Sequence, residues 1–211
     1  MNIVAQVAIV IVSGYLLGSI PTANIVMRLA RHRDLRKIGT GSVTSTAVML
    51  HGGRLIGSIS LASEIIKTFI CLTIAYYVSG GALWAMLLML VIASFGQIWS
   101  IWLGWSGGRG QTLFVAGFLV LCPLPFLASV AVFAALFLAT KRYYFSNVAW
   151  HLIAPPMLLL AYKFNPAIFG LGEHTWGYAA TAAVLCAFFL IKNRLKSDDF
   201  VQAQALGTYS R

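Results

Sequence analysis

The chain has 211 residues, of which 60% are hydrophobic and only 9% are charged, and its formal net charge at pH 7 is +10. Soluble domains carry about 25% charged residues, so this composition excludes a soluble globular protein and predicts an all-α integral membrane protein. The basic residues are not joined by an aromatic platform outside the apolar segments, which excludes nucleic acid as an expected partner.

Seven apolar runs are candidates for membrane spans, since a bilayer core of about 30 Å needs about 20 apolar residues per helix. The predicted spans cover residues 3–27, 55–78, 82–103, 112–122, 124–140, 148–168 and 176–192. A Gly-Ser-Ile-Pro sequence at 18–21 predicts a break in the first span. A Cys-Pro-Leu-Pro sequence at 122–125 predicts a tight outer turn between the fourth and fifth. We expect one transmembrane domain over 1–211, with a short cytoplasmic tail over 193–211.

The distribution of basic residues predicts the orientation of these spans. Thirteen of the 15 lysines and arginines flank the first, third and fifth connections or follow the last span. Of the other two, Lys163 falls on the opposite side and Lys67 lies within a span. Because positive residues stay cytoplasmic, the N-terminus is predicted to face outward and the C-terminus to be cytoplasmic.

A glycine-rich loop at 104–112, between the third and fourth spans, contains Arg109. Uncovered backbone amides beside a guanidinium group suit a phosphate group. We therefore expect Arg109 to be catalytic. Glycines and polar side chains in or near this loop are predicted phosphate or substrate ligands, namely Gln97, Ser106, Gly107, Gly108, Gly110 and Thr112.

A second polar loop at 38–46 lies on the same predicted face and contains five hydroxyl side chains. Alone it is also consistent with a flexible loop beside topogenic charge. Together with the Arg109 loop it predicts a site for a phosphorylated substrate, with Thr40 as a second catalytic candidate. The further candidates are neighbouring or basic residues, namely Ser19, Arg36, Gly39, Gly41, Ser42, Thr46 and Arg194.

Glu64 and Lys67 lie three residues apart on one face of the second predicted span. Ionisable groups at membrane depth are paired or functional, so the two either form an internal ion pair or support the loops of the site from behind. Histidines and cysteines do not cluster in the sequence, and neither a metal nor another cofactor is expected.

These motifs resemble those of the bacterial acyl-phosphate-dependent glycerol-3-phosphate acyltransferase family, over roughly residues 18–195. Its Gly-Ser-Ile-Pro break, followed by Asp-Ile-Arg and Gly-Ser-Gly-Asn, is similar to residues 18–21 and 34–42 here. Its acidic residue and lysine, three apart, are similar to Glu64 and Lys67. Its Gly-His ahead of Gly-Gly-Lys-Gly is similar to residues 96–97 ahead of 107–110, where Gln97 replaces the histidine and Arg109 the lysine.

The resemblance implies seven membrane helices, an outward N-terminus and a place in the bacterial cytoplasmic (inner) membrane. The implied partners are acyl phosphate, glycerol 3-phosphate and membrane lipids. The family's third motif, His-x-x-Asn-Ile-x-Arg-Leu, is matched at Arg194 and Leu195, while Phe188 and Ile191 stand where it has histidine and asparagine. The sequence does not indicate an oligomeric state.

The expected reaction joins the acyl group to glycerol 3-phosphate and gives lysophosphatidic acid for phospholipid biosynthesis. The Arg109 loop is expected to hold one phosphate, and residues 40–42 the other, with Arg36 or Arg194 nearby. Two other functions stay open: a relative that binds a phosphorylated metabolite or lipid without acyl transfer, and a small transporter. The absence of an internal repeat weighs against the transporter.

Overall fold

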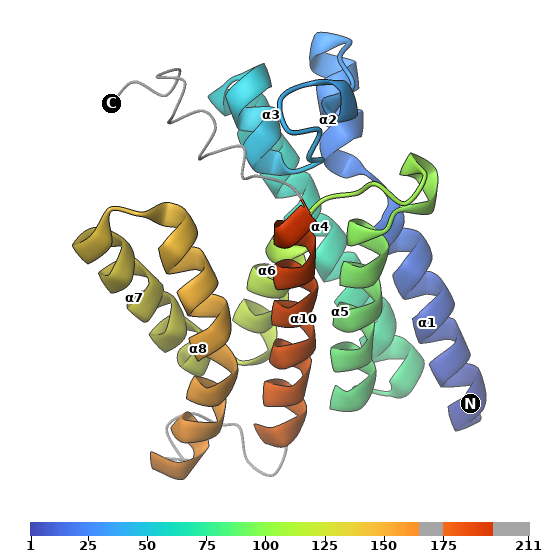
Figure 1. Cartoon of the computed structure of the whole chain (residues 1–211). Helices are drawn as coiled ribbons and strands as arrows, with labels where there is room; N and C mark the ends of the chain where they lie inside the picture. The colour runs from blue at the N-terminus through green and yellow to red at the C-terminus, as the bar shows by residue number, and fades with distance from the viewer. Residues whose placement is uncertain (165–174, 196–211) are drawn as a thin grey trace.

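A computed structural model describes residues 1–164 and 175–195 of the chain, and within these ranges all regular structure is helical. Successive long helices run in alternating directions (Figure 1). The elements in chain order are α1 (Ile3–Ser19), α2 (Thr22–Arg31), the 3₁₀ turn η1 (Leu35–Lys37), α3 (Ser45–Gly52), α4 (Arg54–Ser79), α5 (Leu83–Ile98), the 3₁₀ turn η2 (Ile101–Leu103), α6 (Gln111–Leu121), α7 (Pro123–Thr140), α8 (Tyr143–Phe164) and α10 (Thr175–Leu195).

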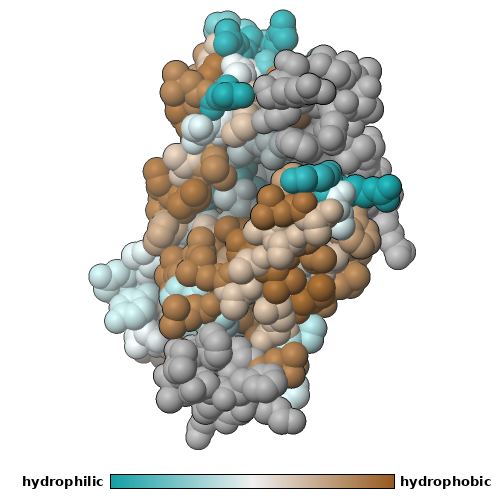
Figure 2. All heavy atoms as spheres, turned by 90° about the vertical axis from the view of Figure 1, so that its left-hand side faces the viewer, coloured by the Kyte–Doolittle hydropathy of each residue, from teal (hydrophilic) through white to brown (hydrophobic). Residues whose placement is uncertain are grey.

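Five segments of the described chain are helical, long and apolar enough to cross a membrane: 3–31, 54–79, 83–103, 123–140 and 175–192. The helices at 111–121 and 145–160 are apolar but shorter. Apolar side chains cover most of the visible surface of the helices, and polar ones gather toward the end where α2 and α3 lie (Figure 2). The chain is therefore an all-α, multi-pass integral membrane protein, as its composition predicts.

The predicted break in the first span is confirmed. Helix α1 ends at Ser19 and α2 begins at Thr22, because Pro21 cannot donate the backbone hydrogen bond that would continue the helix. Gly18 stands where α1 crosses α5, and a Cβ atom there would overlap the backbone of Ala93. Small residues at such crossings let two membrane helices approach closely. The broken end of α1 is thus held against α5.

Several predicted boundaries are wrong in informative ways. Residues 45–52 form α3, a helix that the second loop was not predicted to contain, and the side chain of Thr44 caps it by accepting from the Ala47 amide at 3.1 Å. The proline pair at 123 and 125 lies inside the first turn of α7, where proline is tolerated, so only Cys122 separates α6 from α7. Helix α8 begins at Tyr143, five residues earlier than predicted.

Residues 20–53 form a small cap over one end of the bundle, containing α2, η1 and α3 (Figure 1). The cap has its own apolar core, separate from those between the long helices, made of Ala23, Met27, Leu35, Val43, Ala47, Val48 and Leu103. Leu103 comes from η2, so this core also joins the cap to the segment that precedes the Arg109 loop. The two polar loops are therefore packed together.

Candidate active site

The two polar loops meet at a cavity of about 120 Å³ beneath the cap. Its wall is made of the starts of α3 and α6, of Arg109, and of residues of α4 and α5. The lining residues are Thr44, Ser45, Thr46, Met49, Leu61, Glu64, Gln97, Arg109, Gly110, Gln111 and Thr112. A second cavity of about 10 Å³, lined in part by Ser19, Lys67, Gly107 and Gly108, shares Glu64 and Gln97 with the first.

Two helix N-termini face the larger cavity. Helix α6 begins after Gly110, whose φ of +73° is readily adopted by glycine, and no side chain caps it. The first amides of a helix have no acceptor within the helix, and its N-terminus has a partial positive charge. Helix α3 brings a second N-terminus to the same wall. Together with Arg109 these groups make a cavity suited to an anion.

The Arg109 loop folds back over the end of α5. The amides of Gly107 and Gly108 donate to the carbonyl oxygens of Ile98 at 3.1 Å and Gln97 at 2.9 Å. The prediction that these two amides are free to bind phosphate is therefore wrong, because α5 already occupies them. A Cβ on Gly108 would lie 2.5 Å from the Val43 carbonyl oxygen, which shows how closely the loop approaches residues 38–46.

Glu64 lies at the wall between the two cavities and is 2% exposed. Its carboxylate is attracted by Lys67 and lies within hydrogen-bonding reach of Thr112, Ser45 and Gln97. These partners come from α4, α6, α3 and α5, so one acidic side chain links four helices. Gln97 also presents a side-chain oxygen that is buried without a partner among the described residues.

Lys67 connects this acidic group to the break in the first helix. Its ammonium donates to the carbonyl oxygens of Gly18 at 3.3 Å and Ile20 at 3.0 Å. Ser100, just after α5, donates at 2.5 Å to the carbonyl of Ser19. The break thus exposes backbone acceptors, and both α4 and the α5 end bind to them. Glu64 and Lys67 thus contact the segments around the cavity from α4, and a supporting role for them in the site stays a prediction.

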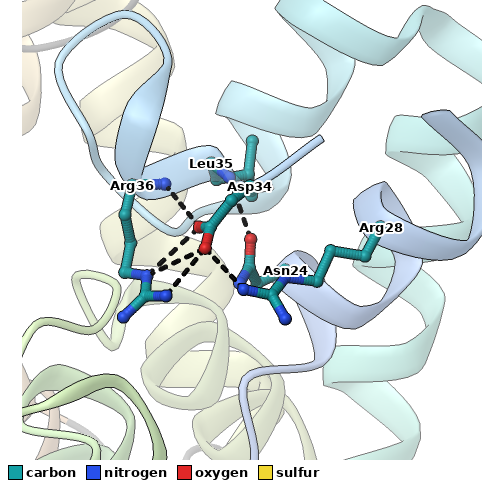
Figure 3. A network of polar contacts seen from close by, with 5 residues as sticks. All are labelled: Asn24, Arg28, Asp34, Leu35 and Arg36. Atoms are coloured by element: carbon teal, nitrogen blue, oxygen red, sulfur yellow. Dashed lines mark hydrogen bonds and ion pairs between the residues drawn. The ribbon is translucent and has the colours of Figure 1, made fainter. Parts of the chain in front are cut away.

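Arg36 does not line the larger cavity, and its guanidinium lies against the Asp34 carboxylate (Figure 3). The Asp34 carboxylate accepts from the Arg36 guanidinium at 2.7 Å and from Arg28 at 2.5 Å. The Asn24 side chain accepts from the Leu35 amide at 2.9 Å, which ties the same loop to α2. The Arg36 hydrogen bonds lower the pKa of Asp34 well below its usual range, with Arg28 adding to the effect. Arg36 therefore has a structural partner.

The lowered pKa of Asp34 predicts a dependence of stability on pH. A carboxyl whose pKa is lower in the folded state stabilises the fold above its unfolded pKa, about 3.9, and loses this effect as the pH falls further. We expect Asp34→Asn to reduce stability at pH 7 by at most about 1 kcal/mol, because the pair is near the surface. Thermal unfolding from pH 7 to 2 should show the difference between the two proteins beginning to narrow below about pH 4 and narrowing further as the pH falls. A constant difference would contradict this role.

Several predicted ligands line neither cavity: Arg36, Gly39, Thr40, Gly41, Ser42 and Ser106. Ser42 is buried at 5% exposure, and Thr40 is half-buried. The Arg194 side chain and the tail from residue 196 lie outside the described residues. In the described ranges, no three His, Cys, Asp or Glu side chains are grouped so that they could hold a metal ion.

An apolar groove of about 550 Å³ between α4 and α6 lies next to the larger cavity. Leu61, Gln111 and Thr112 line both. Beyond them the groove is lined by Ile65, Phe69, Val115, Ala116, Leu119 and Val120. A cavity with a polar wall therefore lies beside a surface that is suited to a hydrocarbon chain.

The sequence profile of the family described as glycerol-3-phosphate acyltransferase matches residues 8–202. This chain belongs to that family. The protein named glycerol-3-phosphate acyltransferase of Agrobacterium fabrum is 32% identical over 157 residues, covering 73% of this chain and 74% of the relative. That of Prochlorococcus marinus is 28% identical over 196 residues, covering 93% of this chain and 94% of the relative.

The fold is also that of a solved member of the family. The crystal structure of PlsY (YgiH), an integral membrane glycerol 3-phosphate acyltransferase, in its glycerol 3-phosphate form aligns with a TM-score of 0.71 at 21% identity. The alignment covers 97% of this chain and 94% of that one. The lysophosphatidic acid form of the same protein gives a TM-score of 0.72 at 20% identity.

One residue of this chain that lies beside the candidate site, Lys192, was not predicted from the sequence to belong to it. Lys192 of α10 is only 9% exposed, and its ammonium donates to the Ile98 carbonyl at 3.1 Å. Its place among the basic residues near the C-terminus predicts only a role in membrane orientation. Its burial depends on the packing of α10 against α5, which adjacent residues do not reveal. A lysine one helical turn after the aromatic Phe188 is the only local hint.

Proposed function

We propose that this acyltransferase moves a fatty acyl group from acyl phosphate to a hydroxyl of glycerol 3-phosphate. The products are lysophosphatidic acid, an intermediate of phospholipid biosynthesis, and inorganic phosphate. The observation that supports this most is the joining of an anion-binding cavity to an apolar groove through Leu61, Gln111 and Thr112. The names of the relatives agree with this reaction.

Phosphoryl oxygens bind at the start of α6 in this proposal. The Arg109 guanidinium can hold two oxygens at once, and the first amides of α6 can donate to the same group. The sequence predicted that the Gly107 and Gly108 amides bind this phosphate. The proposal assigns it to Arg109 and α6 instead, because those two amides donate to carbonyl oxygens of α5. The proposal assigns no contact to Thr40 or Arg36, which lie off the larger cavity.

The chemical step needs positioning more than a protein nucleophile. The substrate hydroxyl oxygen attacks the carbonyl carbon of the acyl phosphate, the bond from that carbon to the phosphate oxygen breaks, and phosphate leaves with the electron pair. The hydroxyl proton passes to a phosphate oxygen of the substrates. Arg109 and the α6 N-terminus stabilise the charge that develops on the leaving phosphate. Among the described residues that line the larger cavity, Glu64 is the only acidic one, and its neighbours already surround its carboxylate.

The acyl chain lies in the groove between α4 and α6, with the acyl phosphate entering sideways from the lipid. Phe69 and Leu119 at the far part of the groove are about half exposed, so a long chain can continue into the bilayer. A chain leaving lipid for this groove gains contacts rather than dehydration, because both surroundings are apolar. We therefore infer that the groove orients the donor more than it selects its length.

In the membrane, we propose seven spans, formed by α1 with α2, then α4, α5, α6, α7, α8 and α10. The N-terminus faces outward and the cap faces the cytoplasm of a bacterium, at the inner membrane. The alternating helix directions (Figure 1) and the basic residues near the cap support this orientation. Membrane-impermeant labelling of a cysteine added at Met1 should succeed in intact cells, and labelling only after lysis would reverse the orientation.

A direct assay tests the reaction. The purified protein, in lipid nanodiscs, is given a long-chain acyl phosphate and radiolabelled glycerol 3-phosphate. We expect labelled lysophosphatidic acid and inorganic phosphate in equal amounts, with no phosphate release when the acceptor is omitted. Stabilisation of the protein by glycerol 3-phosphate without turnover would instead indicate a binding protein, and neither effect would remove the proposed function.

A further inference from the structure

Lys192 is a buried cation that the proposed chemistry does not use. It lies near the end of α10, 94 residues along the chain from Ile98. Its Nζ atom is nevertheless 3.1 Å from the Ile98 carbonyl oxygen at the end of α5. Placing a lysine here is costly unless its ammonium has a partner, and a carbonyl at a helix C-terminus is a favourable one. The position of this residue therefore needs an explanation beyond membrane orientation.

The carbonyl that Lys192 binds is also the one that holds the Arg109 loop. The Gly107 amide donates to the same Ile98 oxygen, also at 3.1 Å, and the next amide, of Gly108, donates to Gln97. The Ile98 side chain lies under Gly110, where a Cβ would be only 3.0 Å from its Cδ1 atom. Ile98 thus supports the loop, because Gly107 and Gly110, on the two sides of Arg109, both contact it.

Helix α10 also contacts the end of α5 through aromatic side chains. Phe188, one turn before Lys192, lies with its ring centre 6.0 Å from that of Phe95 and 5.6 Å from that of Trp99. The aromatic contacts fix where α10 crosses the end of α5, and the charge-assisted hydrogen bond of Lys192 then fixes the carbonyl of Ile98. The Ile98 carbonyl oxygen therefore accepts hydrogen bonds from both the end of α10 and the Arg109 loop.

We propose that Lys192 is a positioning residue for acyl transfer, which holds the Ile98 carbonyl so that the glycine loop presents Arg109 to the phosphate. This inference rests on the proposed function. Lys192 itself acts on the loop rather than on the reacting atoms. A misplacement of a catalytic group by about 1 Å can cost about 10²-fold in rate, so the effect on turnover is expected to be large.

A double-mutant cycle with Arg109 separates this role from a general loss of stability. Lys192→Met is expected to lower kcat/KM by about 10- to 100-fold in the wild-type background. In the Arg109→Ala background the same change should cost less than about threefold, because the group that it positions is already gone. Lys192→Gln, which keeps a donor without the charge, should retain more activity than Lys192→Met, and the exposed Lys141→Met serves as the matched control.

The double-mutant cycle has outcomes that would contradict the role proposed for Lys192. Equal losses from Lys192→Met in the two backgrounds, or wild-type kcat/KM in Lys192→Met, would overturn the proposal. Should Lys192→Met fail to fold, the cycle is measured with Lys192→Gln, and thermal unfolding of every variant reports stability separately. An inactive wild-type protein would instead refute the acyl transfer itself, so the two failures are distinguishable.

Discussion

Replacing Arg109 by alanine is expected to lower kcat/KM for acyl transfer by about 10²- to 10³-fold, the usual cost of removing one group that stabilises developing charge. Among the described residues that line the larger cavity, Arg109 is the only cation. Without it, the leaving phosphate is stabilised by the helix N-termini at the cavity wall and by no guanidinium group. The rate of lysophosphatidic acid formation, measured over a range of both substrates, gives the loss.

The controls for Arg109 concern charge and shape. Arg109→Lys keeps a positive charge but loses the two-pronged donor, so we expect an intermediate rate. The nearby Ser106→Ala, which alters a loop side chain outside both cavities, should leave the rate close to wild type. Equal rates for wild type and Arg109→Ala would show that the loop does not bind the leaving phosphate.

Replacing Glu64 by alanine is expected to reduce both stability and activity. Removal of one partner from a buried charged pair typically costs about 3–5 kcal/mol in the free energy of unfolding, because the other charge is left buried. Here the remaining charge is Lys67, which is 6% exposed. Activity should fall as well, because Ser45, Gln97 and Thr112 lose the group that gathers them at the cavity.

A double variant distinguishes these two effects. Glu64→Leu with Lys67→Met removes both charges and should recover part of the lost stability, as is usual when both members of a buried pair are replaced. It should not recover activity, because three walls of the cavity still lack their common partner. Equilibrium unfolding in mixed micelles and the acyl transfer assay measure the two quantities, with Ser63→Ala on the same helix as the control. Recovery of full activity in the double variant would contradict the role given to Glu64.

The sequence indicated the membrane class and most of the helices because composition and long apolar runs are local properties. The break before Thr22 was predictable, since Pro21 acts on its own backbone wherever it is placed. Helix α3 was not, because its eight residues show little separation of apolar and polar faces and it begins in a run of hydroxyl residues. Its existence depends on the cap of Thr44 and on the small core of the cap.

The sequence named several residues that share a cavity, but it did not reveal how they are connected. Gln97, Glu64, Arg109 and Thr112 do line one cavity, which glycine content and charge could suggest. The acceptors of the Gly107 and Gly108 amides could not be foreseen, because hydrogen bonds to the end of α5 depend on how the loop turns back. Asp34 and Arg36 are two residues apart, so the sequence does suggest that they pair, although Arg36 was predicted to be a substrate ligand.

The proposed active site depends above all on where the phosphorylated acceptor binds. An experimental structure of the protein with glycerol 3-phosphate would test this most directly. We predict phosphoryl oxygens within hydrogen-bonding distance of the Arg109 guanidinium and the first amides of α6. A phosphate bound elsewhere, with this cavity containing only water, would contradict the proposed active site.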